Sequence, residues 1–365
     1  MQYITIIALV AFIITITLII SYIRSNQRLK SRLKESFGKM PEQKKCEFES
    51  IESYHRNSEM NHVSSKTIDN ITWDDLDMNI VFKRINTCLT SVGEEYLYDS
   101  LHQIQTGKKI LSKREHLIAC LEQNPESRLK LQMSLAKSGK QNYNGLASYI
   151  FNTNAKVLKY SFIYNILALV PVICIFISIF TQYGIIFFIF AAILNGLVHY
   201  NIKLKIERDL SAIRYFSSIL QCVNKICKTE GSDTFPFFTE LNKSYKVFKD
   251  LRTTLSGILR KDFSDMAIFA EYLKIIFLMD IRNYNKIVRR ISKYSDDFHT
   301  LYKCVGEIDM AICVLSFRNS LPFCCRPNFH NENSIYFEDL YHPLLSDPVP
   351  NCGKISKDSI ITGSN

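Results

Sequence analysis

The chain has 365 residues, enough for two or more domains, and it carries a net charge of +10. Such a charge points to partners such as nucleic acid or an anionic membrane and does not define a fold. The eleven cysteines are scattered from Cys46 to Cys352 without a C-x-x-C pair. This spacing argues against a zinc site and favours a reduced, cytosolic setting in which cysteines act as small apolar residues.

An uncharged apolar run from Ile4 to Ile23 is the first predicted membrane span. At roughly 1.5 Å per residue, the run is long enough to cross a hydrocarbon core about 30 Å thick. A cleaved signal peptide is the alternative, but it needs basic residues before the run and small residues at a cleavage site. Neither is present, so the sequence favours an uncleaved transmembrane anchor over residues 1–23.

A second apolar region, residues 159–202, predicts a transmembrane helical hairpin. Phe162 to Phe180 can span, "TQYG" forms a turn, and Ile185 to Val198 returns. The alternative is a buried hairpin in a soluble core, but a core helix normally has a polar face and this region has none. Tyrosines stand where interfacial aromatic residues belong, at Tyr160, Tyr164, Tyr183 and Tyr200.

Basic residues flank all three predicted spans on one side. They are Arg24, Arg28, Lys30, Arg32 and Lys34, then Lys156 and Lys159, then Lys203, Lys205 and Arg208. The positive-inside rule places all three clusters in the cytoplasm. We therefore expect a multi-pass protein of the cytoplasmic (inner) membrane with its soluble parts facing the cytoplasm. The cluster after Ile23 is also expected to meet anionic lipid headgroups.

The soluble parts of the chain are predicted to be mainly helical. Residues 24–71 are predicted as a basic juxtamembrane segment and linker, because residues 40–70 are polar and lack a clear period. Residues 72–158 have helical spacing of apolar residues, and Thr90 or Ser91 can cap one of these helices, with Ser91 and Glu94 fitting a capping box.

Residues 203–329 are predicted as the second helical part. One helix is expected from Lys203 to Cys227, and a long lever helix from Phe263 to Leu321, since Pro and Gly are missing between Phe263 and Val305. Residues 330–365 change character, with Pro, Asn and a strand-like "SIYF".

Three ordered blocks of residues resemble the MutS family of mismatch-repair ATPases. The first matches "T-x-x-G-x-x-x-L" through Thr90, Gly93 and Leu97. It also matches "I-x-x-R-x-x-x-I/V" through Ile110, Arg114 and Ile118, with one residue more between the isoleucine and the arginine. The second resembles "LD-x-x-A" and the turn after it through Ile308, Asp309, Ala311 and Pro327, with one residue fewer before the alanine. The third matches the start of the ATPase domain through His342, Pro343, Leu344, Leu345, Pro350, Asn351 and 360–365.

The resemblance implies a mainly α fold. Together with the three spans predicted from the apolar runs, it comprises a MutS-like helical core and lever domain with three transmembrane helices, followed by the first strands of a truncated α/β P-loop ATPase domain. Its implied nucleotide-binding residues are Val349, Pro350, Asn351, Gly363, Ser364 and Asn365. In a P-loop, backbone N–H groups cradle the phosphates, a lysine reaches them and a hydroxyl holds Mg²⁺.

The P-loop lysine and hydroxyl do not follow Gly363 in this sequence. The resemblance therefore implies ATP, Mg²⁺ and a homodimer formed through the ATPase domain for an intact parent chain, and no catalytic or metal-binding residue within these 365. No mismatch-reading domain precedes the core, so mismatch recognition is not carried over. "FAE", from Phe269 to Glu271, matches the family's Phe-x-Glu wedge only literally, and we expect Phe269 to pack in the core.

One helix carries the predicted DNA contacts. Arg282, Lys286, Arg289, Arg290 and Lys293 recur mainly at steps of three and four, which could follow DNA phosphates. A solvated helix face is the alternative, and no aromatic interleaving indicates base stacking. The expected function is that of a membrane-anchored MutS-like ATPase whose core couples nucleotide state to a DNA or partner clamp. The alternative is a membrane-anchored helical scaffold for protein partners, without a nucleic-acid role.

Overall fold

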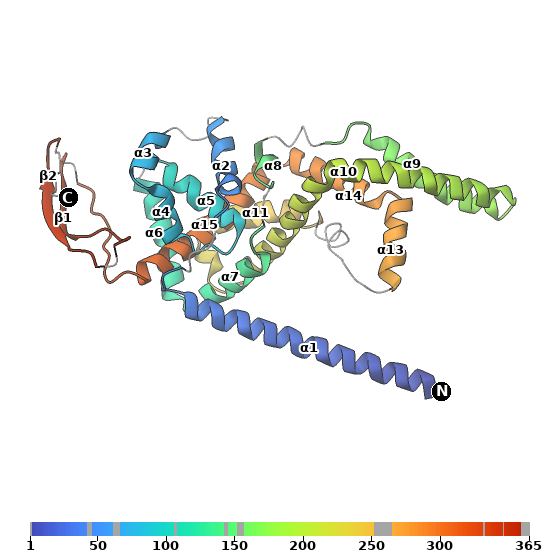
Figure 1. Ribbon diagram of the computed structural model, residues 1–365, viewed down its shortest axis with the longest axis horizontal. Helices are drawn as coiled ribbons and strands as arrows, with labels where there is room; N and C mark the ends of the chain where they lie inside the picture. The colour runs from blue at the N-terminus through green and yellow to red at the C-terminus, as the bar shows by residue number, and fades with distance from the viewer. Residues whose placement is uncertain are drawn as a thin grey trace.

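A computed structural model describes residues 2–41, 46–60, 66–105, 108–141, 145–151, 157–251, 265–330, 333–345 and 347–358, apart from the side chains of residues 2–11, 14 and 265–270. The described chain is mainly helical with two short strands, which confirms the predicted class. In Figure 1, a helical body carries the strands at one end, while the first helix and a long helical hairpin project towards the other end.

Helices account for nearly all regular structure. Before the hairpin they are α1 (Gln2–Ser36), α2 (Phe48–Met60), α3 (Asn70–Asp75), α4 (Met78–Ile85), α5 (Ser91–His102), α6 (Lys108–Gln123), α7 (Pro125–Ser138) and α8 (Ser148–Phe151). The hairpin is α9 (Ser161–Ser178) and α10 (Tyr183–Ile226), followed by η2 (Ser232–Thr234), α11 (Phe238–Phe248), α13 (Asp265–Ile276), α14 (Met279–Lys293) and α15 (Ser295–Asn319).

The core of the body forms around α5, α15 and the second half of α10. α15 lies antiparallel to α5, since its later residue Asp309 meets Thr90 and its earlier residue Tyr302 meets Glu95. Apolar side chains of α10 such as Phe216 and Val223 are buried in the same core. Phe216 makes edge contacts with Phe248 and Phe298, which are favourable aromatic geometries.

Two helices, α9 and α10, are long and apolar enough to cross a membrane. A core helix of a soluble protein would be mostly buried, but only 22% and 17% of their apolar windows are buried. Small residues line the seam between them, at Ala168, Gly184 and Ala191. Such residues let helices approach closely where lipid surrounds them.

The first predicted span has a different outcome. Residues 2–23 belong to helix α1, but the side chains of residues 2–11 lie outside the described part. Among the described residues, the structure therefore has two candidate membrane-spanning helices in place of the predicted three, and the span predicted at Ile4 to Ile23 is not one of them.

A polar joint holds the hairpin together. Pro171 lies inside α9 and has no N–H, so it cannot donate to the carbonyl of Leu167 four residues earlier. The Asn195 side chain of α10 donates to that carbonyl at 2.9 Å and to the carbonyl of Ile276, the last residue of α13, at 2.7 Å. Neighbouring helices commonly satisfy carbonyls freed by proline in this way. Asn195 thereby ties three helices together.

The helix boundaries differ from the predictions in three places. α10 continues through Lys203 without a break, so hairpin and body share one helix. The predicted lever over 263–321 is divided where Leu278 adopts a left-handed φ of 50° and again at Tyr294. No glycine or proline marks either break. Leu278 is fully buried, so tertiary packing determines this backbone conformation.

The predicted linker also contains structure. α2 lies within residues 40–70 and buries Ile51, Tyr54, His55 and Ser58. The buried face of α2 consists of aromatic and polar side chains as well as Ile51. The apolar periodicity of the sequence therefore did not predict this helix. Tyr54 stacks on Tyr302 of α15, with ring centroids 4.9 Å apart.

The chain after α15 forms an antiparallel pair of strands, β1 (Ile335–Leu340) and β2 (Asn351–Ile355). Ile335 pairs with Ile355 and Leu340 with Asn351, with an irregularity near Asp339, where φ is 52°. β1 agrees with the predicted strand at "SIYF". The strand expected at 360–361 lies outside the described residues.

Candidate functional site

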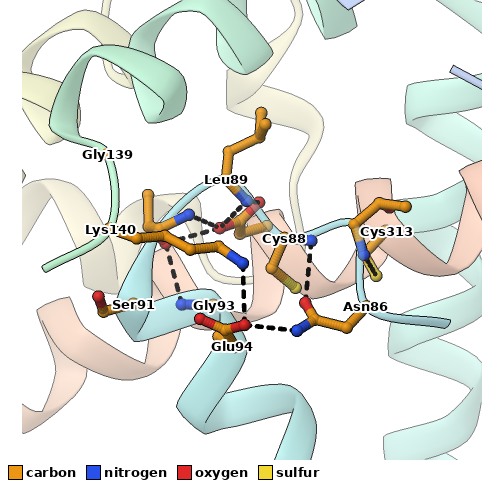
Figure 2. A network of polar contacts seen from close by, with 12 residues as sticks. Asn86, Cys88, Leu89, Ser91, Gly93, Glu94, Gly139, Lys140 and Cys313 are labelled. Atoms are coloured by element: carbon orange, nitrogen blue, oxygen red, sulfur yellow. Dashed lines mark hydrogen bonds and ion pairs between the residues drawn. The ribbon is translucent and has the colours of Figure 1, made fainter. Parts of the chain in front are cut away.

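The most elaborate polar network of the body lies where α4 leads into α5. We call it the junction and define it as Asn86, Leu89, Thr90, Gly93 and Glu94 with Lys140 and Asp309. Figure 2 shows its network of polar contacts, in which Lys140 bonds to Glu94 at the start of α5. The junction brings together chain segments about fifty and more than two hundred residues apart.

Asp309 is the centre of the junction. Its carboxylate accepts hydrogen bonds from the Leu89 N–H at 3.1 Å, the Thr90 N–H at 2.8 Å and the Thr90 hydroxyl at 2.6 Å. Thr90 in turn caps α5 by accepting from the Gly93 N–H at 2.9 Å. A carboxylate at a helix N-terminus is stabilised by the unpaired N–H groups and the helix dipole. Burial nevertheless raises the pKa of Asp309, while these hydrogen bonds oppose the rise.

Two glycines allow α5 and α15 to approach this closely. A Cβ on Gly93 would lie 2.2 Å from an Asp309 carboxylate oxygen, and a Cβ on Gly306 would lie 2.6 Å from the Cβ of Tyr96. Real Cβ atoms do not tolerate such distances. The glycine of the first motif block therefore faces the aspartate of the second, and the Asp309 carboxylate leaves no room for a side chain at position 93.

Glu94 and Lys140 form the outer side of the junction. Their charged atoms are 2.8 Å apart, and the Asn86 amide donates to the same Glu94 oxygen. Burial alone would lower the pKa of Lys140, but the Glu94 carboxylate more than compensates and raises it. Glu94 therefore pairs with Lys140. This ion pair takes the place of the predicted capping box between Ser91 and Glu94. The Ser91 hydroxyl accepts from the Gln141 N–H at 2.8 Å.

Two thiols border the junction. The Thr87 N–H donates to Cys313 Sγ at 3.3 Å, and that thiol donates to the Ile85 carbonyl at 3.0 Å. Burial raises the pKa of the nearby Cys88 well above its ordinary value. Cys88 is therefore a thiol at neutral pH, and a thiol is a poor nucleophile.

A second polar cluster lies further along α5 and α15. Tyr96 donates to a Glu307 oxygen at 2.7 Å, and the guanidinium of Arg114 lies 3.4 Å from Glu307. Arg114 is the arginine of the "I-x-x-R" block. Gly93 and Arg114 of the first block thus both contact α15, which carries Asp309 of the second block.

A cavity of about 1270 Å³ opens beside the junction. Its lining includes both positively and negatively charged residues, namely Arg32, Lys83, Arg84, Lys140, Glu35 and Glu94. Leu344 of the third block also lines it. The cavity therefore lies between the end of α1, the junction and the segment that leads to β2.

The predicted DNA-binding residues lie on α14, where the structure gives several of them other partners. Arg282 donates to Asn165 at 2.9 Å and Arg289 to Ser161 at 2.7 Å, both at the start of α9. Arg290 donates to the Val247 carbonyl at 2.9 Å and lies over the Tyr294 ring. Lys286 is exposed, and Lys293 extends over Tyr294. This face therefore lies beside the end of the hairpin that joins the body, near the start of α9. We call this end the foot of the hairpin.

The predicted nucleotide-binding residues are only partly described. Val349 is exposed and precedes β2, and its carbonyl accepts from the Asn351 side chain at 2.9 Å. Pro350 lies between them. Gly363, Ser364 and Asn365 lie outside the described residues. The Phe269 side chain is also outside the described part, although its backbone belongs to α13.

Sequence reasoning missed Lys140, Glu307 and Asn195. Each is a single polar residue whose partner is distant in the chain, so neither periodicity nor a local motif signals it. The position of Glu307, two residues before Asp309 on a largely apolar helix, is the one available hint.

The comparisons with known proteins return no match, whether to a family model, to a curated protein or to a solved structure. The site's chemistry must therefore be judged from its geometry. The junction holds a capped helix, a paired lysine and, beside it at Cys88, a protonated thiol, an arrangement suited to fixing two helices together.

Proposed function

We propose that this chain forms the membrane-anchored helical core of a MutS-like ATPase. In this proposal, the core couples nucleotide state in an α/β domain to a DNA or partner clamp. The single observation that carries the proposal is the contact of Gly93 and Thr90 with Asp309. Residues chosen only for their family spacing, about 220 positions apart, meet with no room for a Cβ.

The path of α15 supports a coupling role. Its last turn is held by Arg318, which makes a two-pronged contact with Glu115 of α6, and β1 follows α15 in the chain. Its middle is fixed to α5 through Asp309. Its first residues follow α14, which touches the foot of the hairpin. A displacement of α15 at its end next to β1 would be transmitted to both α5 and α14, because tightly packed helices resist sliding independently of one another.

Membrane anchoring is part of the proposal. The hairpin of α9 and α10 is proposed to cross the membrane twice, and α1 to add a third span, with the body in the cytoplasm. In Figure 1, the outer ends of α1 and of the hairpin project on the same side of the body, as a common membrane would require. Exposed apolar side chains such as Phe176, Phe187 and Phe190 suit lipid and not water.

ATP, Mg²⁺ and dimerisation are proposed for the ATPase domain as a whole. The test is to express the complete gene product, with any residues encoded after Asn365, and to isolate it from membranes in lipid nanodiscs. Mg²⁺-dependent ATP hydrolysis together with DNA binding that weakens steeply with salt is the expected result. Failure to bind any nucleotide would overturn the ATPase proposal.

One observation favours the alternative function, a membrane scaffold for protein partners. The arginines predicted to contact DNA are hydrogen-bonded to the foot of the hairpin instead. Under the scaffold function, the complete gene product would bind neither nucleotide nor DNA at low salt, yet would remain a folded membrane protein.

A further inference from the structure

We infer that the foot of the hairpin carries a binding surface for the phosphates of anionic lipids. The surface, here called the basic collar, consists of Lys159, Lys203, Arg282, Lys286 and Arg289. This inference rests on the membrane-spanning hairpin of the proposed function and goes beyond it, because it gives the basic face of α14 a ligand.

The Asn195 joint fixes where the collar lies along the hairpin. Asn195 and Leu167 are level, since they are hydrogen-bonded. Ser161 precedes Leu167 by six residues and Lys203 follows Asn195 by eight, so both lie towards the body by about 9 and 12 Å at a rise of roughly 1.5 Å per residue. Arg289 donates to Ser161, which places it at the same level as Lys203. Residues from two distant segments thus share one layer.

The layer matches the boundary of a membrane. Towards the hairpin tip the exposed side chains become apolar, beginning with Tyr160, Phe162 and Ile163. α13 meets the hairpin with its last residue at the Asn195 joint, and Figure 1 shows it running at a steep angle to α9 and α10. A helix at such an angle to the spans lies close to the plane of the membrane. Its exposed Tyr272 is typical of the interface.

The basic residues of α14 present one face. Arg282, Lys286 and Arg289 follow steps of four and three, so they lie on the same side of the helix, and all three are exposed. Each arginine uses only one of its five N–H groups on α9, which leaves others able to bind a phosphate. Two carboxylates lie nearby. Glu271 pairs with Lys274 at 3.1 Å and with Lys203 of the collar at 3.9 Å, and Asp280 lies 3.8 Å from His199. In the described part of the chain, the other four collar residues are not paired with either carboxylate. The collar therefore keeps an excess of positive charge.

A DNA duplex is the competing ligand for this face. The bilayer argues against it, because a face within one or two turns of the membrane boundary meets headgroups first. Basic residues near a membrane surface each contribute roughly 1 kcal/mol to anionic lipid binding, which corresponds to about a fivefold change in affinity.

The test uses the full chain reconstituted in phosphatidylcholine bilayers, with spin-labelled phosphatidylglycerol and phosphatidylcholine as probes. We expect the motionally restricted lipid to favour phosphatidylglycerol, and the preference to weaken with salt. R282Q/K286Q/R289Q should reduce it by about threefold or more. K108Q/K109Q/K113Q on α6, which removes the same charge from the body, should leave it unchanged.

Three results would overturn the collar: no preference in the native protein, an equal preference in the α14 triple variant, or loss of binding to a short DNA duplex in that variant while the lipid preference persists. The last result would assign the face to DNA. If no restricted lipid is seen with either probe, the hairpin does not span the bilayer, and the proposed function fails separately from the collar.

Discussion

The junction and the hairpin use polar and apolar side chains in opposite ways. At the junction, Asp309 and Thr90 are buried among apolar neighbours, and the contacts of Asp309 and Lys140 join segments distant in the chain. Along the hairpin, large apolar side chains are exposed and small ones are buried, with Asn195 as a buried polar contact. The difference is the one expected if water surrounds the body and, as proposed, lipid surrounds the hairpin.

Their glycines provide the strongest contrast. Gly93→Ala should destabilise the body by about 3 kcal/mol or more, because the new Cβ would overlap the Asp309 carboxylate. Gly196→Ala in the hairpin is the matched control, since a Cβ there meets nothing within 4 Å. The midpoint of urea unfolding in detergent, followed by fluorescence of the single tryptophan, Trp73, gives the difference. Equal midpoints for the two variants would contradict the described packing.

The next largest effect is expected for Asp309→Ala. The change leaves the N–H groups of Leu89 and Thr90 and the Thr90 hydroxyl without their shared acceptor, at a cost of about 2–3 kcal/mol. Asp75→Ala, at an exposed position of α3, should change stability by less than about 0.5 kcal/mol. The same urea titration distinguishes the two. A negligible effect at Asp309 would mean that the junction does not hold α5 to α15.

Acid should weaken the body through His102. Burial lowers the pKa of His102 to about 4, below its unfolded value near 6.5. The folded state therefore disfavours the charged form. Stability is complete above about pH 6.5 and falls by about 2 kcal/mol as pH drops towards 4.

The measurement uses the contact between His102 and Trp73, whose rings stack with centroids 3.5 Å apart. Trp73 fluorescence should report protonation of His102, with a midpoint near pH 4. His102→Gln should remove that titration and flatten the dependence of the urea midpoint on pH. An unchanged titration in the variant would show that another group is responsible.

The smallest effect is expected in the hairpin. Asn195→Leu removes the donor to the carbonyls of Leu167 and Ile276 and should cost about 1 kcal/mol, since polar contacts between membrane helices are individually weak. Asn201→Leu is the control, because Asn201 donates only within its own helix, to the Leu197 carbonyl. Thermal unfolding in detergent should separate the variants, and identical curves would argue against the joint.

Apolar patterning predicted the helical class and the two hairpin helices, because a long uncharged run has few alternatives. Family spacing predicted Thr90, Gly93 and Asp309 as notable, yet their contact depends on how α5 and α15 pack. The break at Leu278 had no local signal, since a buried leucine is held there in a left-handed conformation by its neighbours. Lys140 and Asn195 were missed for the same reason: their partners are distant in the chain.

The most direct test of the coupling account is hydrogen exchange of the complete gene product in nanodiscs, with and without a non-hydrolysable ATP analogue. The account predicts that nucleotide changes the exchange of residues 86–94 and 305–313 and of α14, as well as the segment around β1 and β2. A change confined to the strand segment, with the junction unaffected, would contradict it.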